Sequence, residues 1–191
     1  MNITSFLLYC FIVTVTPGPT NLDILSAVNN HGTKRAMQYT YGATIAFGSL
    51  LAISAILNSM LITVIPKVLI VMQIIGSIYM LYLAYQIYKM DTSKPTVKRT
   101  GTFISGFLMQ FLNPKVVTFT MTVIPTFILP YYTALPTVII SVVAISAIGF
   151  LAFMIWVLFG AIFKRFLQRH RKVVNVIMAL FLVYAAIMIW M

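Results

Sequence analysis

The sequence predicts an all-α integral membrane protein with six transmembrane helices, arranged as a 3+3 inverted repeat. Of its 191 residues, 61% are hydrophobic and only 8% are charged, whereas about a quarter of the residues of a soluble globular domain are charged. The apolar residues form long runs, and the basic residues lie in short clusters between them, which is typical of a membrane protein. We therefore expect a single membrane domain over residues 1–191.

Six segments are long enough to cross the hydrocarbon layer, which takes about 20 apolar residues in helical form. They are residues 3–28, 39–65, 68–88, 102–130, 136–163 and 173–191. Pro66 predicts a tight turn after the second span, because the residue before a proline avoids helical geometry. The first segment, which starts MNITSFLLYC, has no basic residue and no small-residue cleavage site. We therefore expect it to remain as a membrane helix.

The basic residues predict the orientation, because Lys and Arg in short loops are retained in the cytoplasm. The first, third and fifth connections hold Lys34 and Arg35, then Lys89, Lys94, Lys98 and Arg99, then Lys164, Arg165, Arg169, Arg171 and Lys172. The opposite side has only Lys67, and Lys115 lies within a span. Both termini are therefore predicted to be extracytoplasmic.

Two spans contain prolines that interrupt the helical hydrogen bonds. In the first, TPGPTN (16–21), Pro17 and Pro19 lack the amides that would bond the carbonyls of Val13 and Val15. In the fourth, FLNPK (111–115), we expect Asn113 to cap a new half-helix with Pro114 at its first position. Such breaks are tolerated at membrane depth only where protein or a water-filled cavity satisfies the freed groups.

The breaks fall in the first and fourth spans, which correspond if residues 1–90 and 100–191 are two three-helix repeats. Because each repeat has an odd number of spans, the second is inverted. Paired breaks in an inverted repeat point to a transporter's binding site near the bilayer midplane. Amides at the half-helix starts favour a carboxylate and freed carbonyls favour an ammonium, so a zwitterionic amino acid suits both. Ordinary proline kinks are the alternative reading.

Polar and ionisable residues accompany both breaks. Asp23 and Lys115 are charged inside spans, where a charge is costly and usually faces a cavity or a partner. We hypothesise that they line the central cavity and form an ion pair, with Asp23 as candidate proton carrier; the alternative is that they snorkel to the interface. Asn21 lies in the first break, and Gln110 and Asn113 share a helix face, so we expect these to line the same cavity.

Other span residues have a packing or anchoring role in our interpretation. Gly42 with Ala46, and Gly48 with Ala52, would let helices approach closely. Asn58 and Gln73 are expected to form interhelical hydrogen bonds. Aromatic residues near predicted span ends are expected to anchor at the lipid headgroups; these are Tyr39, Tyr41, Tyr85, Tyr88, Tyr131, Tyr132 and Trp190.

The composition argues against several other classes of protein. Nucleic-acid binding needs basic residues over a soluble core, and here they lie between apolar spans. The single Cys10 excludes an intramolecular disulfide and a CxxC redox pair. The two Asp and two His residues are far apart in sequence, so no metal site is expected. No nucleophile, base and orienting group can be assembled, so we expect neither an enzyme nor a cofactor.

Together, TPGP in the first span, HGTKRA (31–36) after it, the glycine-bearing second span from Tyr39, and FLNPK in the fourth resemble the LysE/RhtB family of bacterial amino-acid exporters. The resemblance covers nearly the whole chain. The segment TPGPTNLDILSAVNNHG most resembles members that export cysteine and O-acetylserine, with homoserine and threonine exporters more distant.

The resemblance implies efflux of a small amino acid across the bacterial plasma membrane, in antiport with protons. The family's motif positions fall on Pro17, Gly18, Pro19, Asn113 and Pro114. Asn21 matches a position where polar residues are usual. The chain departs from the pattern at Thr20, where many relatives have Asn or Asp, and at Asp23, where relatives usually have an apolar residue.

The candidate substrate-binding residues are therefore Pro17, Gly18, Pro19, Asn21, Asp23, Gln110, Asn113, Pro114 and Lys115. Two other functions remain as alternatives, a membrane electron- or thiol-transfer subunit and a metal-ion exporter of related six-helix design. The sequence leaves open which amino acid is carried, the coupling ion, the direction of transport and the oligomeric state, a homodimer included.

Overall fold

The computed structural model describes residues 3–57, 74–75, 77–82, 84–85, 87–89 and 101–188. Within these residues the protein is all-helical, as predicted, and the described residues between 74 and 89 are helical as well. The helices are α1 (Ile3–Val15), α2 (Pro19–His31), α3 (Thr33–Ile56), α5 (Phe103–Leu112), α6 (Pro114–Val123), the π-helix η1 (Ile124–Ile128), α7 (Leu135–Ile162), α8 (Lys164–Arg169) and α9 (Arg171–Met188).

Among the described residues, α3 and α7 are each long and apolar enough to cross a membrane. Two further spans are broken. The chain bends by 54° between α1 and α2, and by 70° between α5 and the segment from α6 through η1. These four elements overlap the first, second, fourth and fifth predicted spans. The helix α9 overlaps the sixth, and much of the third falls outside the described residues. So do Pro66, Lys67, Asn58, Gln73, Trp190 and most of the polar loop 89–101.

The first predicted connection turned out to be almost entirely helical. The helix α2 runs to His31 and α3 starts at Thr33, so only Gly32 separates them. Gly32 has a φ of 84°, in the region that favours glycine, and this residue alone turns the chain. The second span therefore starts earlier than the predicted residue 39, and Lys34 and Arg35 lie in the first turn of α3 rather than in a loop.

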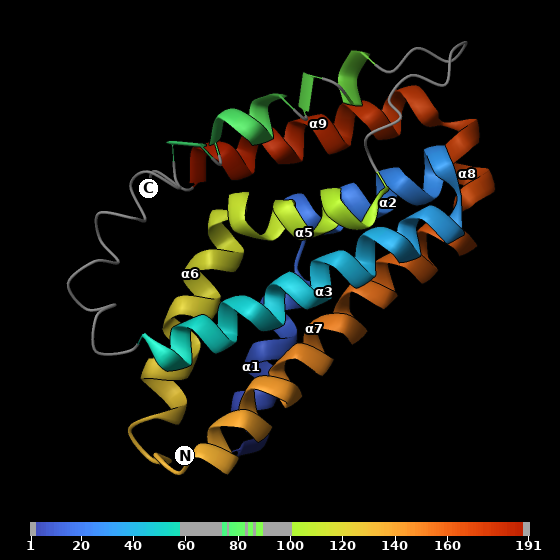
Figure 1. Cartoon of the computed structure of the whole chain (residues 1–191). Helices are drawn as coiled ribbons and strands as arrows, with labels where there is room; N and C mark the ends of the chain where they lie inside the picture. Colours follow the sequence, from blue (N-terminus) through green and yellow to red (C-terminus); the bar gives the residue numbers. More distant parts are fainter. Residues whose placement is uncertain are drawn as a thin grey trace.

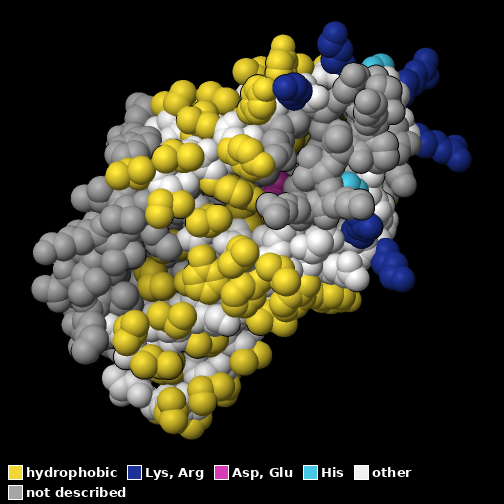
Figure 2. All heavy atoms as spheres, turned by 45° about the horizontal axis from the view of Figure 1, so that its top comes forward, with side chains coloured by type: hydrophobic (Ala, Val, Ile, Leu, Met, Phe, Trp, Pro, Cys, Tyr) yellow, Lys and Arg dark blue, Asp and Glu magenta, His cyan; other side chains and the backbone are white. Residues whose placement is uncertain are grey.

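Apart from Lys115, the described basic residues gather at one end of the molecule (Figure 2). The helix α8 packs against α2 at this end. Gly101, which closes the polar loop, lies against Arg35, since a Cβ added to it would be 3.3 Å from the Arg35 Cβ. The first, third and fifth connections therefore meet on one face wherever the structure describes them.

The helices pack as an elongated bundle in which α3 runs beside α7 and packs along α5 (Figure 1). The two helices α3 and α5 approach at their backbones, because a Cβ on Gly42 would overlap the Phe103 carbonyl and one on Gly106 would overlap the Tyr39 carbonyl. The close approach predicted at Gly42 is thus confirmed, and Gly106 is its counterpart. Apolar side chains of α1, α3, α6, η1 and α7 form one core, including Phe47 and Ile145.

Candidate functional site

The first break, between α1 and α2, satisfies its freed carbonyls with side chains. The hydroxyl of Thr16 donates to the Val13 carbonyl at 2.8 Å. The indole Nε1 of Trp156, on α7, donates to the Val15 carbonyl at 3.0 Å. These are the two carbonyls that Pro17 and Pro19 were predicted to leave without an amide. The break is therefore a stable part of the fold, held partly from α7.

Asn21 stabilises the same break from the start of α2. Its Nδ2 donates to the Thr14 carbonyl at 3.0 Å and to the Thr16 carbonyl at 2.8 Å. Both contacts need an N–H donor, so the orientation of the amide is determined and its oxygen faces the other way. Asn21 is 3% exposed, and its Oδ1 is a buried acceptor without a hydrogen-bond partner among the described residues. A buried acceptor without a partner is costly and indicates a missing donor.

The second break, between α5 and α6, has the predicted cap. The Asn113 Oδ1 accepts from the Lys115 amide at 3.1 Å, and Pro114 occupies the first helical position. The start of α2 is different, since Pro19 follows an N-cap Gly18 that has no side-chain oxygen. The first amides of α2 therefore have no capping side chain among the residues that the structure describes.

The two breaks meet at the hydroxyl of Thr20. Its Oγ1 accepts from the Asn113 Nδ2 at 2.9 Å and from the Gln110 Nε2 at 3.1 Å. These bonds join residues about ninety positions apart in sequence, across the predicted repeat boundary. A hydroxyl that accepts two hydrogen bonds still carries one proton to donate. The Thr20 hydroxyl is thus both the link between the broken helices and an available donor.

Lys115 forms a second link between the breaks. Its Nζ donates to the Thr16 carbonyl at 2.9 Å and to the Thr16 hydroxyl at 2.8 Å. The freed carbonyls of the first break were expected to favour an ammonium, and in this structure the ammonium bound at Thr16 is that of Lys115.

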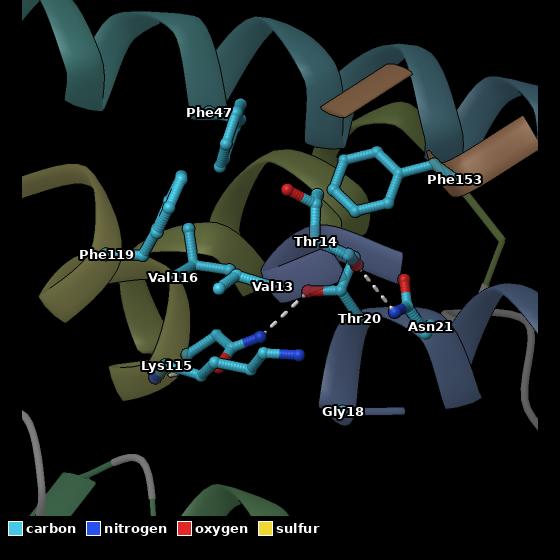
Figure 3. A pocket seen from close by; sticks show the side chains of 11 residues that line it. Val13, Thr14, Gly18, Thr20, Asn21, Phe47, Lys115, Val116, Phe119 and Phe153 are labelled. Carbon is cyan, nitrogen blue, oxygen red and sulfur yellow. Dashed lines mark hydrogen bonds between the residues drawn. The ribbon is translucent and has the colours of Figure 1, made fainter. Parts of the chain in front are cut away.

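A narrow cavity of about 20 Å³ lies between the breaks, inside a hollow of about 310 Å³ that includes open solvent. Figure 3 shows the rings of Phe47, Phe119 and Phe153 on one side and Lys115, Thr20 and Asn21 on the other. The described lining is completed by Val13, Thr14, Gly18, Asn113 and Val116. The cavity therefore combines an apolar aromatic wall with a polar wall built from both breaks.

Asp23 does not line this cavity, contrary to expectation. Its Oδ2 accepts from the Tyr39 hydroxyl at 3.0 Å, whereas Lys115 binds Thr16, so the hypothesised ion pair between Asp23 and Lys115 is absent. Asp23 lies one helical turn beyond Pro19, and there α2 packs against α3. Asp23 is 4% and Tyr39 1% exposed, so neither snorkels nor anchors at the protein surface.

Of the candidate residues, Gly18, Asn21, Asn113 and Lys115 line the cavity. The others lie around it. Pro19 and Pro114 start the half-helices, Gln110 is buried behind Thr20, and Pro17 is exposed.

Sequence reasoning missed several residues of the site. Thr16 and Thr20 were noted only as parts of the motif, and Trp156 and the three Phe residues have no local signal, because they reach the site through the packing of α3, α6 and α7. The polar residues beside each break were the one sequence signal that could have identified Thr16 and Thr20.

An apolar helical body in which two broken helices meet at a cavity with one polar wall is typical of a membrane transporter of small solutes. The chain belongs to the LysE type translocator family, whose model matches residues 11–191.

Curated relatives over nearly the full length are named cysteine/O-acetylserine efflux proteins. The protein of Klebsiella pneumoniae is 35% identical over 98% of this chain and 96% of its own length. That of Salmonella typhi is 31% identical over 100% and 98%, and that of Escherichia coli K12 is 28% identical over 98% and 97%. No solved structure matches the chain.

Proposed function

We propose that this protein exports a small amino acid of the cysteine and O-acetylserine type across the bacterial plasma membrane. The substrate binds in the cavity between the two broken helices and is released by alternating access. The observation that carries the proposal is the polar wall, where two breaks distant in sequence are joined at Thr20. Beside it lies the buried Asn21 oxygen, which no described residue pairs.

The polar wall complements the two charged groups of a zwitterionic amino acid. The Asn21 Oδ1 is an acceptor for the substrate ammonium, and it is buried without a partner in the described part of the chain. The Thr20 hydroxyl and the uncapped start of α2 supply donors for the carboxylate. The Lys115 ammonium lies on the same wall and is a further donor.

The aromatic wall favours a small, uncharged side chain. Phe47, Phe119 and Phe153 are each at most 6% exposed and present rings to the cavity. Lys115 is the one charged side chain among the described lining residues, so a cationic substrate side chain has no anionic partner there. This chemistry fits the substrates for which the relatives are named.

For alternating access we propose that residues 1–90 and 100–191 form an inverted repeat, with both termini extracytoplasmic. In its support, each half starts with a broken helix, α1 with α2 and α5 with α6, and continues with a long apolar helix, α3 or α7. Proton antiport, with Asp23 as the carrier, is part of the proposal because Asp23 is a buried carboxylate on the same half-helix as Thr20 and Asn21. The electron- or thiol-transfer and metal-export alternatives have no supporting observation in the described residues or the named relatives.

The proposal is tested by uptake of labelled cysteine, O-acetylserine, homoserine, threonine and lysine into inverted vesicles, with and without a proton gradient. We expect accumulation of cysteine or O-acetylserine and loss of it in Asn113→Ala, which removes the cap and the bond to Thr20. Ser141→Ala is the control, because Ser141 bonds only its own helix at Thr137 and does not line the cavity. No accumulation of any of the five amino acids would refute the assignment.

A further inference from the structure

Lys115 lies between two hollows of the protein. One is the cavity between the breaks. The other is an open groove of about 780 Å³, mouth included, lined in part by Tyr9, Thr118 and Thr122. Val13, Lys115 and Phe119 line both. These three side chains therefore form the partition between the cavity and the groove.

The groove lies in the half of the molecule away from the basic end. Its residues belong to α1 and α6, the halves of the broken helices that extend away from α2 and α5 (Figure 1). The basic residues Lys34 and Arg35 follow α2 at the other end. In the predicted orientation, the groove leads from the cavity towards the extracytoplasmic side.

We propose that Lys115 and Thr16 form a latch that closes the cavity towards this groove. The inference rests on the proposed function and concerns the regulation of the same site. The Lys115 side chain, which is part of the partition, extends from α6 and donates to both oxygens of Thr16 in the break of the other helix. With the latch closed, α1 and α6 are held together where the groove meets the cavity.

The receiving side of the latch is preorganised. The Thr16 hydroxyl donates a hydrogen bond to the Val13 carbonyl, so the lone pairs of the hydroxyl oxygen are free to accept from Lys115. The Thr16 carbonyl is held in place by the Asn21 amide. Gly18 leaves the path of the lysine open, because a Cβ there would be 3.3 Å from the Lys115 Cδ. Both oxygens are thereby positioned for one ammonium.

Substrate releases the latch by competition for this ammonium. The bonds from the Lys115 ammonium to the two neutral Thr16 oxygens have one charged partner. A bond to the carboxylate of a bound amino acid has two charged partners of opposite sign, so the carboxylate attracts the ammonium more strongly. A carboxylate at the polar wall, beside Thr20 and the start of α2, therefore draws Lys115 away from Thr16. The partition opens when the cavity is occupied and stays closed when it is empty.

The latch is tested by thiol accessibility in a Cys10→Ser background, which removes the chain's own cysteine. Thr14→Cys reports on the cavity, since Thr14 lines it but not the groove, and Thr118→Cys reports on the groove alone. An impermeant methanethiosulfonate with a sulfonate group is applied to intact cells and to inverted vesicles. The reagent is anionic, so loss of the lysine charge by itself would slow the reaction rather than speed it.

Lys115→Met retains the length of the side chain and removes both bonds to Thr16. We expect it to speed labelling of Thr14→Cys from the groove side by about tenfold or more and to leave Thr118→Cys unchanged. Thr16→Val keeps the Lys115 charge and removes one of its acceptors, and should act in the same direction to a smaller extent. Labelling of Thr14→Cys at the same rate in Lys115→Met as with the native lysine would overturn the latch. Absence of labelling of Thr118→Cys from either face would also overturn it.

These outcomes are separate from the test of transport. Labelling needs no substrate, so an effect of Lys115 on accessibility without uptake of any amino acid would keep the latch and refute the exporter. Uptake of O-acetylserine with no effect of Lys115 on labelling would refute the latch and keep the exporter.

Discussion

At the scale of single residues, the hydroxyl of Thr20 is the junction of the site. Thr20→Val keeps the shape of the side chain, leaves the Asn113 amide without the Thr20 acceptor, and leaves the Gln110 amide with only a long contact to the Gly106 carbonyl at 3.5 Å. Each unpaired donor costs about 1–3 kcal/mol. We expect a lower melting temperature in detergent and loss of vesicle uptake, whereas Thr20→Ser retains both. A Val variant that transports as well as the native protein would contradict this role.

Asp23 gives a second prediction at this scale. Asp23→Asn retains an acceptor for the Tyr39 hydroxyl and removes the proton-binding group. If Asp23 carries the coupled proton, the Asp23→Asn variant loses uptake driven by a proton gradient. The variant still exchanges labelled for unlabelled substrate, because exchange needs no net proton movement. Tyr39→Phe is the matched control, because it removes the hydrogen bond and keeps the carboxyl group. Equal gradient dependence in Asp23→Asn and the native protein would exclude Asp23 as the carrier.

The sequence predicts some of these residue roles and misses others for a physical reason. The cap by Asn113 follows from the local pattern of Asn before Pro, and the structure has it. The bond from Trp156 to the Val15 carbonyl joins residues 141 positions apart. A proline identifies a carbonyl that lacks its amide, but the donor that replaces the amide depends on how α7 packs against α1.

At the scale of secondary-structure elements, the contact between α3 and α5 depends on glycine. Gly42→Ala places a methyl group on the Phe103 carbonyl, and backbone atoms yield less readily than side chains. We expect lower membrane yield and a lower melting temperature. Gly48→Ala is the control on the same helix, because its methyl group meets the Ser146 hydroxyl at 3.0 Å, which can move. Equal stability of the two variants would show that α3 and α5 can move apart without loss of stability.

Helix boundaries were the least predictable feature of the elements. The spans at 102–130 and 136–163 agree closely with α5 through η1 and with α7. The start of α3 was missed because TKRAMQ is polar, and hydropathy marks the membrane boundary rather than the end of a helix. The conformation of Gly32, rather than apolar length, determines where α2 ends and α3 begins.

At the scale of the whole molecule, the orientation is a prediction from the basic residues. With both termini outside, alkaline phosphatase fused after Met191 is expected to be active and a green fluorescent protein at the same place dark. The measurement compares enzyme activity and fluorescence at matched expression in intact cells. The reverse pattern would place the basic end outside and contradict the proposed direction of the groove.

The membrane class and the two breaks follow from composition and proline positions alone, because both depend on local chemistry. The joining of the breaks at Thr20, and the separation of Asp23 from Lys115, depend on which face each half-helix presents after its bend. A bend of 54° or 70° redirects every side chain beyond it. Simple helical periodicity therefore does not predict contacts across the break.

The glycine contact between α3 and α5 also limits how this protein can move. It is a rigid joint between the two proposed repeats, formed by main chain against main chain. If the repeats rocked past each other as whole bodies, this joint would have to separate in every cycle. The two breaks are the other points at which these helices can change direction. We therefore expect α1 and α6 to move relative to α2, α3 and α5, with their packing against α7 and α3 changing in each cycle.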